Sequence, residues 1–492
     1  IGVVSSIVGT YAVSLWRVDD AEEAMYKSYE VSSCITISST FLLAWLYAGQ
    51  LSLATLVAVG VGLAVTFNPL TSYATSAKSK RVQTIAASTR FGPASVILEG
   101  LSLGYLSSVW ALFVIVGSLS AANLVYSFEF PNNLKLPAVL IGLALAVIMI
   151  VRGRMRGHLV EGFFSAMWIM VFALFLVSMH EVPDVHTYKY VLFGVTLIGV
   201  GMLSHTGNNV SMDTFGPISD NANGIGELAG MSPTARQIMA DLDAAGNTTK
   251  AITKGVAIGS AVIAAVSLFG SFFSDIQRVD PNFEEIVNLA NPVVFVGLLI
   301  GGSLPLLFSG LLIKAVNRAS GLIMAEVRRQ LRDPEIASGA KTPDYANAVT
   351  ISTHSAQVEL VPLGLIAVLA PIAVGFLLKE EALGGFLAGV ILAGQLLAVF
   401  MCNAGGAWDN AKKYVEDGYF GGKGSENHKA SVVGDTVGDP LKDTAGPALN
   451  PMIKVMNLVA LIVAPLVVEY DGYSPGILIG VAVAIVLMVW AV

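Results

Sequence analysis

Acidic side chains recur at helical spacing in one segment near the middle of the chain. Asp213, Asp220 and Glu227 are seven residues apart, so on an α-helix they would share one face. Three like charges in a row repel one another unless cations lie between them, and hard oxygen ligands of this kind suit Mg²⁺ or Ca²⁺. The solvated face of a surface helix accounts for the spacing equally well.

A second segment, shortly after the first, combines amide and ammonium groups. Asn247, Lys250 and Lys254 follow the spacing i, i+3, i+7, which again places them on one helix face. The carbonyl of Asn247 could bind a metal ion, and the two ammonium groups could neutralise phosphate. The simpler alternative is the start of a helix, with Asp243 or Asn247 as the N-cap and basic residues at a membrane border.

The densest charge lies in a third segment, towards the C-terminus. One helix stripe would carry four charged residues at i, i+4, i+7 and i+8: Asp435, Asp439, Lys442 and Asp443. Carboxylates in such a stripe could hold Mg²⁺ while the lysine contacts phosphoryl oxygens. A salt-bridged loop is a poor alternative, because charge this dense beside an apolar span is costly without a function.

The three segments together predict a phosphoryl-transfer site with several Mg²⁺ ions. The glycine-rich run around Lys423 lacks the full P-loop pattern, so the sequence carries no nucleotide-binding motif of that kind. A site that recognises only phosphate groups favours a small polyphosphate, such as pyrophosphate, as its substrate.

The chain that carries these segments is too apolar for a water-soluble protein. Of its 492 residues, 54% are hydrophobic and 13% are charged, whereas soluble domains carry about 25% charged residues. A net charge of −7, with no basic aromatic-rich stretch, excludes a nucleic-acid partner. The two cysteines, Cys34 and Cys402, indicate neither a disulfide framework nor a zinc site.

Apolar runs recur along the whole chain, and a spanning helix needs about 20 largely apolar residues. We therefore predict an all-α fold, a polytopic transmembrane helix bundle with one transmembrane domain over residues 1–492. The runs that qualify or come close are 2–16, 32–48, 51–69, 91–126 (one helix or two), 136–151, 163–179, 190–204, 255–274, 287–313, 360–378, 383–402, 455–468 and 474–492. Lys- and Arg-rich connections would face the cytoplasm: 78–90, 152–156, 236–254, 314–341 and 412–442.

The charged segments closely resemble those of the membrane-bound, ion-pumping inorganic pyrophosphatases. The resemblance rests on Phe215–Ala222, Leu242–Thr249 and above all Gly406–Asn450, with support from Gly301–Pro305 and Glu326–Gln330. It covers most of the chain from about residue 60. It implies a homodimer of sixteen-helix subunits, with the helices in two concentric rings. Such a protein hydrolyses Mg-pyrophosphate to two phosphates at the cytoplasmic face and pumps H⁺ or Na⁺ out of the cytoplasm, across a prokaryotic plasma membrane or the membrane of an acidic organelle.

The resemblance also implies roles for individual residues. Lys412 and Lys442 would contact the phosphates, and Lys454 matches the lysine of the family's ion gate. Asp443 would orient the attacking water, in a catalytic set completed by Asp439, Lys442 and Lys412. Binding of Mg²⁺ and pyrophosphate is implied for Asp220, Asn247, Asp409, Asp435, Asp439 and Asp443.

Lys250 and Thr253 indicate the subtype. Many members of this family have Ala at the position of Lys250 and require K⁺, whereas in the others a lysine supplies the positive charge. Lys250, with Thr253 three residues later, is similar to the K⁺-independent type, which is associated with pumping of H⁺ rather than Na⁺.

The chain departs from the family pattern at three places. The family's first catalytic loop and the helix after it are absent from residues 1–492, so we expect the chain to be the C-terminal part of a longer fold and to be inactive alone. Ser72 stands where the family usually has Glu. Residues 127–188 hold two additional apolar runs, which predict an inserted helical hairpin.

Two other functions remain open on this sequence. A secondary ion transporter would use the membrane acids and Lys454 without hydrolysis, although transporters place such charges near the midplane, between inverted repeats. A catalytically degenerate relative would keep the fold and bind Mg-pyrophosphate without releasing phosphate.

Overall fold

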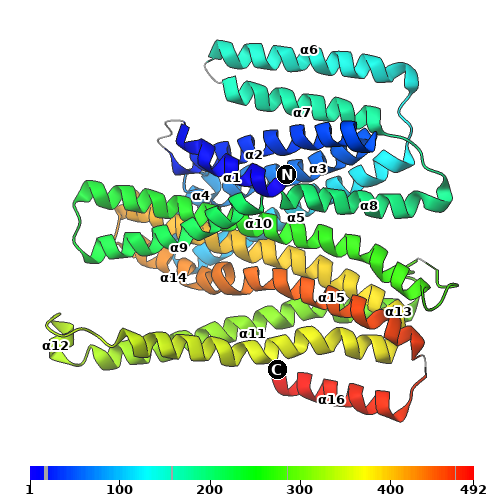
Figure 1. The fold of residues 1–492 in the computed structure, drawn as a ribbon. Helices are drawn as coiled ribbons and strands as arrows, with labels where there is room; N and C mark the ends of the chain where they lie inside the picture. Colours follow the sequence, from blue (N-terminus) through cyan, green and yellow to red (C-terminus); the bar gives the residue numbers. More distant parts are fainter. Residues whose placement is uncertain (16–19, 157–158, 285, 471) are drawn as a thin grey trace. The chain divides into compact units, whose positions relative to one another are not determined.

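The chain folds into a succession of α-helices in the computed structural model (Figure 1), which describes residues 1–15, 20–156, 159–284, 286–470 and 472–492. The described residues form no β-strand, which confirms the all-α class. The helices are α1 (Gly2–Ala12), α2 (Ala21–Leu43), α3 (Leu51–Thr75), α4 (Lys80–Ser88), α5 (Pro93–Ser127), α6 (Asn132–Arg156), α7 (Leu159–Ser178), α8 (Asp184–Leu203), α9 (Thr206–Leu228), α10 (Pro233–Gln277), α11 (Pro292–Gln330), α12 (Pro334–Ala337), α13 (Tyr345–Glu416), α14 (Glu426–Pro440), α15 (Gly446–Glu469) and α16 (Pro475–Ala491). Short 3₁₀ turns lie at Val13–Leu15, Thr89–Phe91 and Tyr419–Gly421, and π-helical turns at Ala44–Ala48 and Leu441–Ala445.

The lengths and composition of these helices are those of a membrane protein. Within the described ranges, nine helical stretches are long and apolar enough to cross a membrane, or ten if α8 and α9, which meet at a bend of 47°, are counted as one span. The predicted polytopic bundle is thereby confirmed. The run 91–126 forms one helix, α5. Residue 16, at the end of the first apolar run, and residues 157–158, inside the predicted hairpin, lie outside the described residues.

The chain divides into two compact units, which we describe separately. Unit 1 comprises Ile1–Gly270 and Gly406–Val432, and unit 2 comprises Ser271–Gly405 and Val433–Val492. The long helices α10, α13 and α14 therefore contribute residues to both units. The single transmembrane domain expected from the sequence stays a prediction.

In unit 1, α3 and α8 pack backbone to backbone. A Cβ placed on Gly60 of α3 would lie 1.9 Å from the carbonyl oxygen of Ile198, and one on Gly201 of α8 would lie 2.0 Å from that of Val57. Only glycine allows such an approach, the usual device by which membrane helices pack closely. This pair is the centre of unit 1, on which α2, α5 and α7 also pack.

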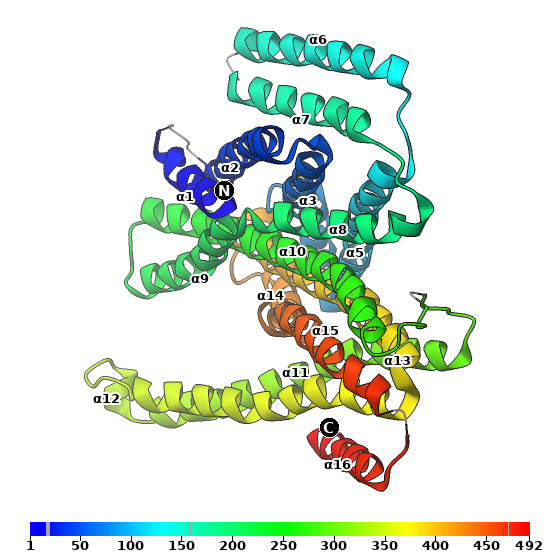
Figure 2. The ribbon, with the colours of Figure 1, turned by 45° about the vertical axis from the view of Figure 1, so that its right-hand side comes forward.

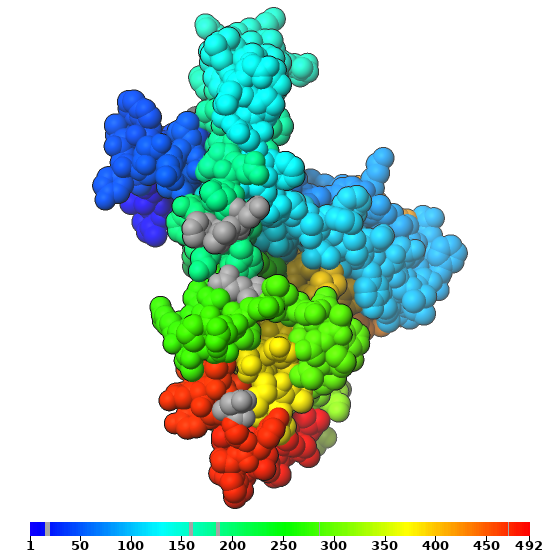
Figure 3. Space-filling view, turned by 90° about the vertical axis from the view of Figure 1, so that its right-hand side faces the viewer, coloured from blue at the N-terminus to red at the C-terminus, as the bar shows by residue number. Residues whose placement is uncertain are grey.

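Helices α6 and α7 form an antiparallel hairpin at one edge of unit 1, as the two views in Figures 1 and 2 show. Gly142 of α6 lies directly against Ala173 of α7, since a Cβ on Gly142 would lie 2.7 Å from that of Ala173. Trp168 of α7 packs on Gly62 of α3. The atoms of α6, cyan in Figure 3, form part of the molecular surface. Two helices thus occupy the predicted apolar runs, and their status as an insertion stays a prediction.

A cluster of small polar side chains joins α1 and α2 to the start of α9. Ser32 donates to Asn208 (3.0 Å), and Asn208 donates to Ser28 (2.6 Å). Ser33 bonds to Nε2 of His205 (2.9 Å), whose ring stacks on Tyr29. We call the following residues the polar seam: Ser6, Thr10, Ser28, Ser32, Ser33, His205 and Asn208.

In unit 2, α11 packs against the second half of α13. Cβ atoms on Gly297 and Gly301 of α11 would each lie 2.0 Å from a carbonyl oxygen of α13, and Gly385 and Gly389 of α13 make the reciprocal approach to α11. The two halves of α13 join at Lys379, whose φ of 72° is not helical. This break separates the two apolar runs predicted at 360–378 and 383–402.

Candidate functional site

The acids of α9 are paired with side chains of α10. The hydroxyl of Thr253 donates to Oδ1 of Asp213 (2.9 Å), and Nζ of Lys250 lies 3.6 Å from Oδ2 of Asp220. The helix predicted for the first acidic segment is confirmed. Each of the two residues that indicate the subtype, Lys250 and Thr253, therefore contacts one of these acids.

The third acid of α9 belongs to a separate pair. Glu227 forms ion pairs with Lys423 and with Arg236, the latter at 3.2 Å. Two of the three acids on α9, Asp220 and Glu227, are thus paired with cations from other segments, whereas Asp213 accepts a hydrogen bond from a hydroxyl, and all three acids remain exposed.

Asp243 and Asn247 lie in the interior of α10, which begins at Pro233. The alternative in which one of them caps a helix is therefore wrong. Both side chains are buried, at 1% and 2% exposed. Asn247 donates to Oδ1 of Asn410 (3.2 Å), whereas its own Oδ1 and the Oδ1 of Asp243 are buried and accept no hydrogen bond from any described residue.

Asp243 is a site residue that the sequence gave no reason to select. Its Oδ2 accepts a hydrogen bond from Asn223 (2.9 Å) and pairs with the ammonium of Lys413, which is 8% exposed. A buried carboxylate requires such a partner. Only the burial of both groups, which no spacing rule reveals, distinguishes this pair from ordinary surface charges.

The end of α13 supplies the remaining predicted site residues of unit 1. Nζ of Lys412 lies 3.3 Å from Oδ1 of Asp409, which is itself buried. The neighbouring Trp408 fixes this turn, because its Nε1 donates to the carbonyl of Val96 (2.8 Å). Two predicted site residues, Asp409 and Lys412, are therefore adjacent on a helix end that the buried Trp408 ties to α5.

Unit 2 holds the acids of the third segment. One carboxylate oxygen of Asp435 lies within 4.8 Å of one of Asp439. The ammonium of Lys442 lies 3.4 Å from Asp435 and 2.8 Å from Asp439, in the π-helical turn Leu441–Ala445 that also contains the exposed Asp443. The predicted stripe is thus partly altered: α14 ends at Pro440 and the wider turn carries Lys442 and Asp443.

Lys454 lies on α15, also in unit 2, and is exposed. Among the described residues it forms no ion pair. Its assignment to an ion gate stays a prediction.

Ser72 contacts a carboxylate from another helix. Its hydroxyl donates to Oε1 of Glu22 on α2, and Ser76 donates to the other oxygen of the same side chain (3.3 Å). Ser72 thus lies against a carboxylate supplied by α2. A pattern search along the chain could not find Glu22, which lies 50 residues away.

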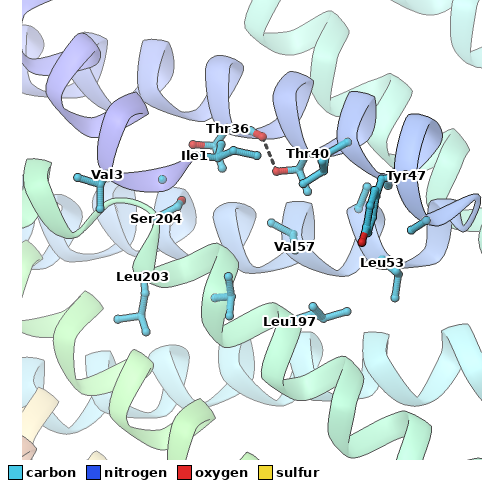
Figure 4. A pocket seen from close by; sticks show the side chains of 16 residues that line it. Ile1, Val3, Thr36, Thr40, Tyr47, Leu53, Val57, Leu197, Leu203 and Ser204 are labelled. Atoms are coloured by element: carbon cyan, nitrogen blue, oxygen red, sulfur yellow. Dashed lines mark hydrogen bonds between the residues drawn. The ribbon is translucent and has the colours of Figure 1, made fainter.

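An apolar pocket in unit 1 is not part of this chemistry. It has a volume of about 660 Å³ and lies among α2, α3 and α8, with uncharged side chains such as Leu53, Val57 and Leu197 lining it (Figure 4). The hydroxyl of Thr40 donates to the carbonyl of Thr36 (2.6 Å), whereas the hydroxyl of Thr36 has no hydrogen-bond partner among the described residues.

The fold and these residues define a class: a multi-pass helical membrane protein that holds carboxylate, amide and ammonium groups at its helix interfaces. The sequence profile of a family described as inorganic H⁺ pyrophosphatase matches residues 1–463. The chain belongs to this family. Its similarity extends over whole helices and is not confined to short motifs.

Several curated proteins are similar to the chain. A protein of Chloroflexus aurantiacus named K⁺-insensitive pyrophosphate-energized proton pump is 48% identical over 100% of this chain and 59% of its own length. A Streptomyces coelicolor protein of the same name is 39% identical over 99% of this chain and 58% of its own length. A Clostridium tetani protein named putative K⁺-stimulated pyrophosphate-energized sodium pump is also 39% identical, over 96% of this chain and 61% of its own length. The chain thus spans about three-fifths of the length of the curated relatives it matches.

Proposed function

We propose that the protein hydrolyses Mg-pyrophosphate to two phosphates and couples the reaction to H⁺ pumping out of the cytoplasm. The observation that carries this proposal is the arrangement on α9 and α10. The exposed Asp220 of α9 pairs with the buried Lys250 of α10, and α10 also carries the buried Oδ1 atoms of Asp243 and Asn247, which accept no hydrogen bond among the described residues. Such an arrangement offers both cation ligands and a positive charge for a phosphate-rich substrate. The names of the relatives point to the same reaction.

The donor set fits Mg²⁺. The buried Oδ1 atoms of Asn247 and Asp243 are hard oxygen donors that accept no hydrogen bond among the described residues, and the paired carboxylates of Asp435 and Asp439 are of the same chemistry. The residues that would hold the metal are Asp220, Asn247, Asp409, Asp435, Asp439 and Asp443. Bound Mg²⁺ would neutralise the charge of the pyrophosphate oxygens and so assist attack by water.

The protein's own side chains would position the substrate and the water. Lys412 and Lys442 would contact the phosphoryl oxygens. Asp443 would hold the attacking water and accept its proton as the bond from phosphorus to the bridging oxygen breaks. Catalysis of this type depends mainly on positioning and electrostatic stabilisation.

The fixed ammonium of Lys250 supports K⁺ insensitivity, and with it H⁺ rather than Na⁺ as the pumped ion. A tethered ammonium 3.6 Å from Asp220 supplies the charge that a bound K⁺ would otherwise provide. The relatives named as K⁺-insensitive proton pumps favour this subtype. We further propose a homodimer, which native mass spectrometry of the purified protein would test.

Phosphate release from Mg-pyrophosphate tests the proposal. It should be measured with and without K⁺ and Na⁺, in membrane vesicles that carry the protein expressed from its whole reading frame, with a pH-sensitive dye to follow acidification. We expect turnover and acidification that are indifferent to both ions, and a loss of at least about a hundredfold for Lys442→Met. Turnover that requires K⁺ would support pyrophosphate hydrolysis but contradict the K⁺-insensitive subtype. Binding of Mg-pyrophosphate without turnover would identify a degenerate relative.

A further inference from the structure

Gly216 on α9 lies directly beneath the side chain of Lys250. A Cβ placed on Gly216 would lie 2.5, 2.6 and 2.9 Å from Cγ, Cε and Cδ of Lys250, distances that real Cβ atoms essentially never show. The methylene stem of Lys250 therefore runs through the space that any other residue at position 216 would occupy. The stem is buried with it, since Lys250 is 7% exposed.

The direction of the stem explains where its ammonium lies. Gly216 and Asp220 are one helical turn apart on α9, so they are neighbours on one face. A lysine that crosses α9 over Gly216 reaches the next turn, where Nζ lies 3.6 Å from Oδ2 of Asp220. The missing side chain at 216 is thus a requirement for this ion pair.

The two helices are held together independently of Lys250. A Cβ on Gly246 of α10 would lie 3.1 Å from Cα of Gly216, so the backbones are in close contact there. Thr253 ties α10 to Asp213 by a hydrogen bond of 2.9 Å. A methyl group at position 216 would therefore displace the flexible lysine more easily than it would separate the helices.

Helix propensity does not account for glycine at this position. Alanine is a better helix former than glycine in a helix interior. Gly224, on the same helix, has no described neighbour within 4 Å of a built Cβ. It therefore provides a matched control, in which the same substitution meets no side chain.

We propose that Gly216 is a positioning residue that makes the protein insensitive to K⁺, because it gives the ammonium of Lys250 access to Asp220. This inference rests on the proposed function. Gly216 has no side chain and contacts no substrate, so it acts only through Lys250.

The test compares Gly216→Ala with Gly224→Ala in the same vesicles. Without K⁺, we expect Gly216→Ala to release phosphate about tenfold more slowly than the unaltered protein, and K⁺ to restore most of this loss. Gly224→Ala should keep both the rate and the indifference to K⁺. An active Gly216→Ala protein that remains indifferent to K⁺ would overturn the proposal.

Two further measurements keep the proposal testable if activity is low. In the double variant Gly216→Ala/Lys250→Ala, the methyl group at position 216 no longer meets a lysine side chain. This protein should therefore match Lys250→Ala in expression level, rate of phosphate release and response to K⁺, and a difference would count against the proposal. Labelling with an amine-reactive reagent, read by mass spectrometry, should find Lys250 more reactive in Gly216→Ala than in Gly224→Ala. This readout needs no turnover, so an inactive protein with altered labelling would reject the proposed function alone, whereas unaltered labelling would reject the role of Gly216.

Discussion

Asp243 and Lys413 form a buried ion pair in unit 1, at 1% and 8% exposed. Removing one member leaves the other charge buried, which typically costs about 3–5 kcal/mol. We expect Asp243→Ala to lower the free energy of unfolding by that amount, measured by thermal or denaturant unfolding of the purified protein in detergent.

The control is Asp241→Ala, on the same helix. Asp241 is exposed and accepts a hydrogen bond only from Gln237 (3.0 Å) in the described structure, so its loss should change stability by less than about 0.5 kcal/mol. Similar melting temperatures for the two variants would show that the Asp243–Lys413 pair is not a source of stability.

At the scale of single residues, the sequence predicted which residues could bind phosphate or metal better than it predicted which residues are buried. Asn247 and Lys250 were selected because their types and spacing fit a phosphate and metal site, and Thr253 because of the family resemblance. The structure places Lys250 and Thr253 against acids of α9. For Asp243 the sequence suggested only a possible helix cap. Its ion-pair partner, Lys413, lies 170 residues away, and a sequence does not show that the two meet.

At the scale of elements, Asp20 stabilises the start of helix α2 through two contacts. Its Oδ1 accepts a hydrogen bond from the backbone N–H of Glu22 (2.9 Å), and its side chain pairs with Lys78. Burial alone would raise the pKa of this carboxyl, but the bond from Lys78 and the backbone donors outweigh it, so the pKa lies below its usual 3.8. The charged form is therefore favoured in the folded protein.

The pH dependence of stability follows from this pKa. Between the lowered value and 3.8 the unfolded chain binds more protons than the folded one, so the contribution of Asp20 is complete above 3.8 and is lost as the pH falls through the lowered value. We expect Asp20→Asn, which keeps the cap, to cost at most about 1 kcal/mol at neutral pH.

Melting temperatures recorded across the acid range would check this prediction. The difference in melting temperature between the unaltered protein and Asp20→Asn should disappear below the lowered pKa. In Asp20→Ala the cap is also lost, so the free energy of unfolding at neutral pH should fall by about 1 kcal/mol more. A gap that is constant with pH would exclude the ion pair as its cause.

Most elements could be predicted from hydropathy, but some of their ends could not. The apolar runs at 136–151 and 163–179 became α6 and α7, and the polar residues near Lys379 mark a real break in α13. Helix α10, in contrast, extends to Pro233 through a polar stretch that hydropathy does not mark, because residues 233–240 are exposed or half-buried and need no apolar run. The π-helical turn at Leu441–Ala445 has no sequence signal that we could identify.

At the scale of the whole molecule, the positive-inside rule predicts which ends of the helices face the cytoplasm. Within unit 2, helix α11 connects the stretch around Asn282 to the basic stretch around Ser338. We expect Ser338→Cys to be shielded from a membrane-impermeant maleimide applied to intact cells, and Asn282→Cys to be labelled.

The native background suits this experiment, because Cys34 is half-buried and Cys402 is buried. Permeabilised cells provide the control, in which both introduced cysteines should react, since Ser338 and Asn282 are exposed. The reverse pattern in intact cells would place the candidate site on the other side of the membrane and would contradict a cytoplasmic substrate.

The polar seam sets a constraint on how the protein is made. The hydrogen bonds that join α1 and α2 to the start of α9 link residues 172 to 198 positions apart. At ribosomal rates of about 5–20 residues per second, roughly 10–40 s pass before Asn208 follows Ser6 and Thr10 out of the ribosome. During that time the hydroxyl groups of α1 and α2 lack their hydrogen-bond partners at the start of α9. We therefore expect the insertion machinery to retain this helix pair and to release it into the lipid only after α9 has arrived.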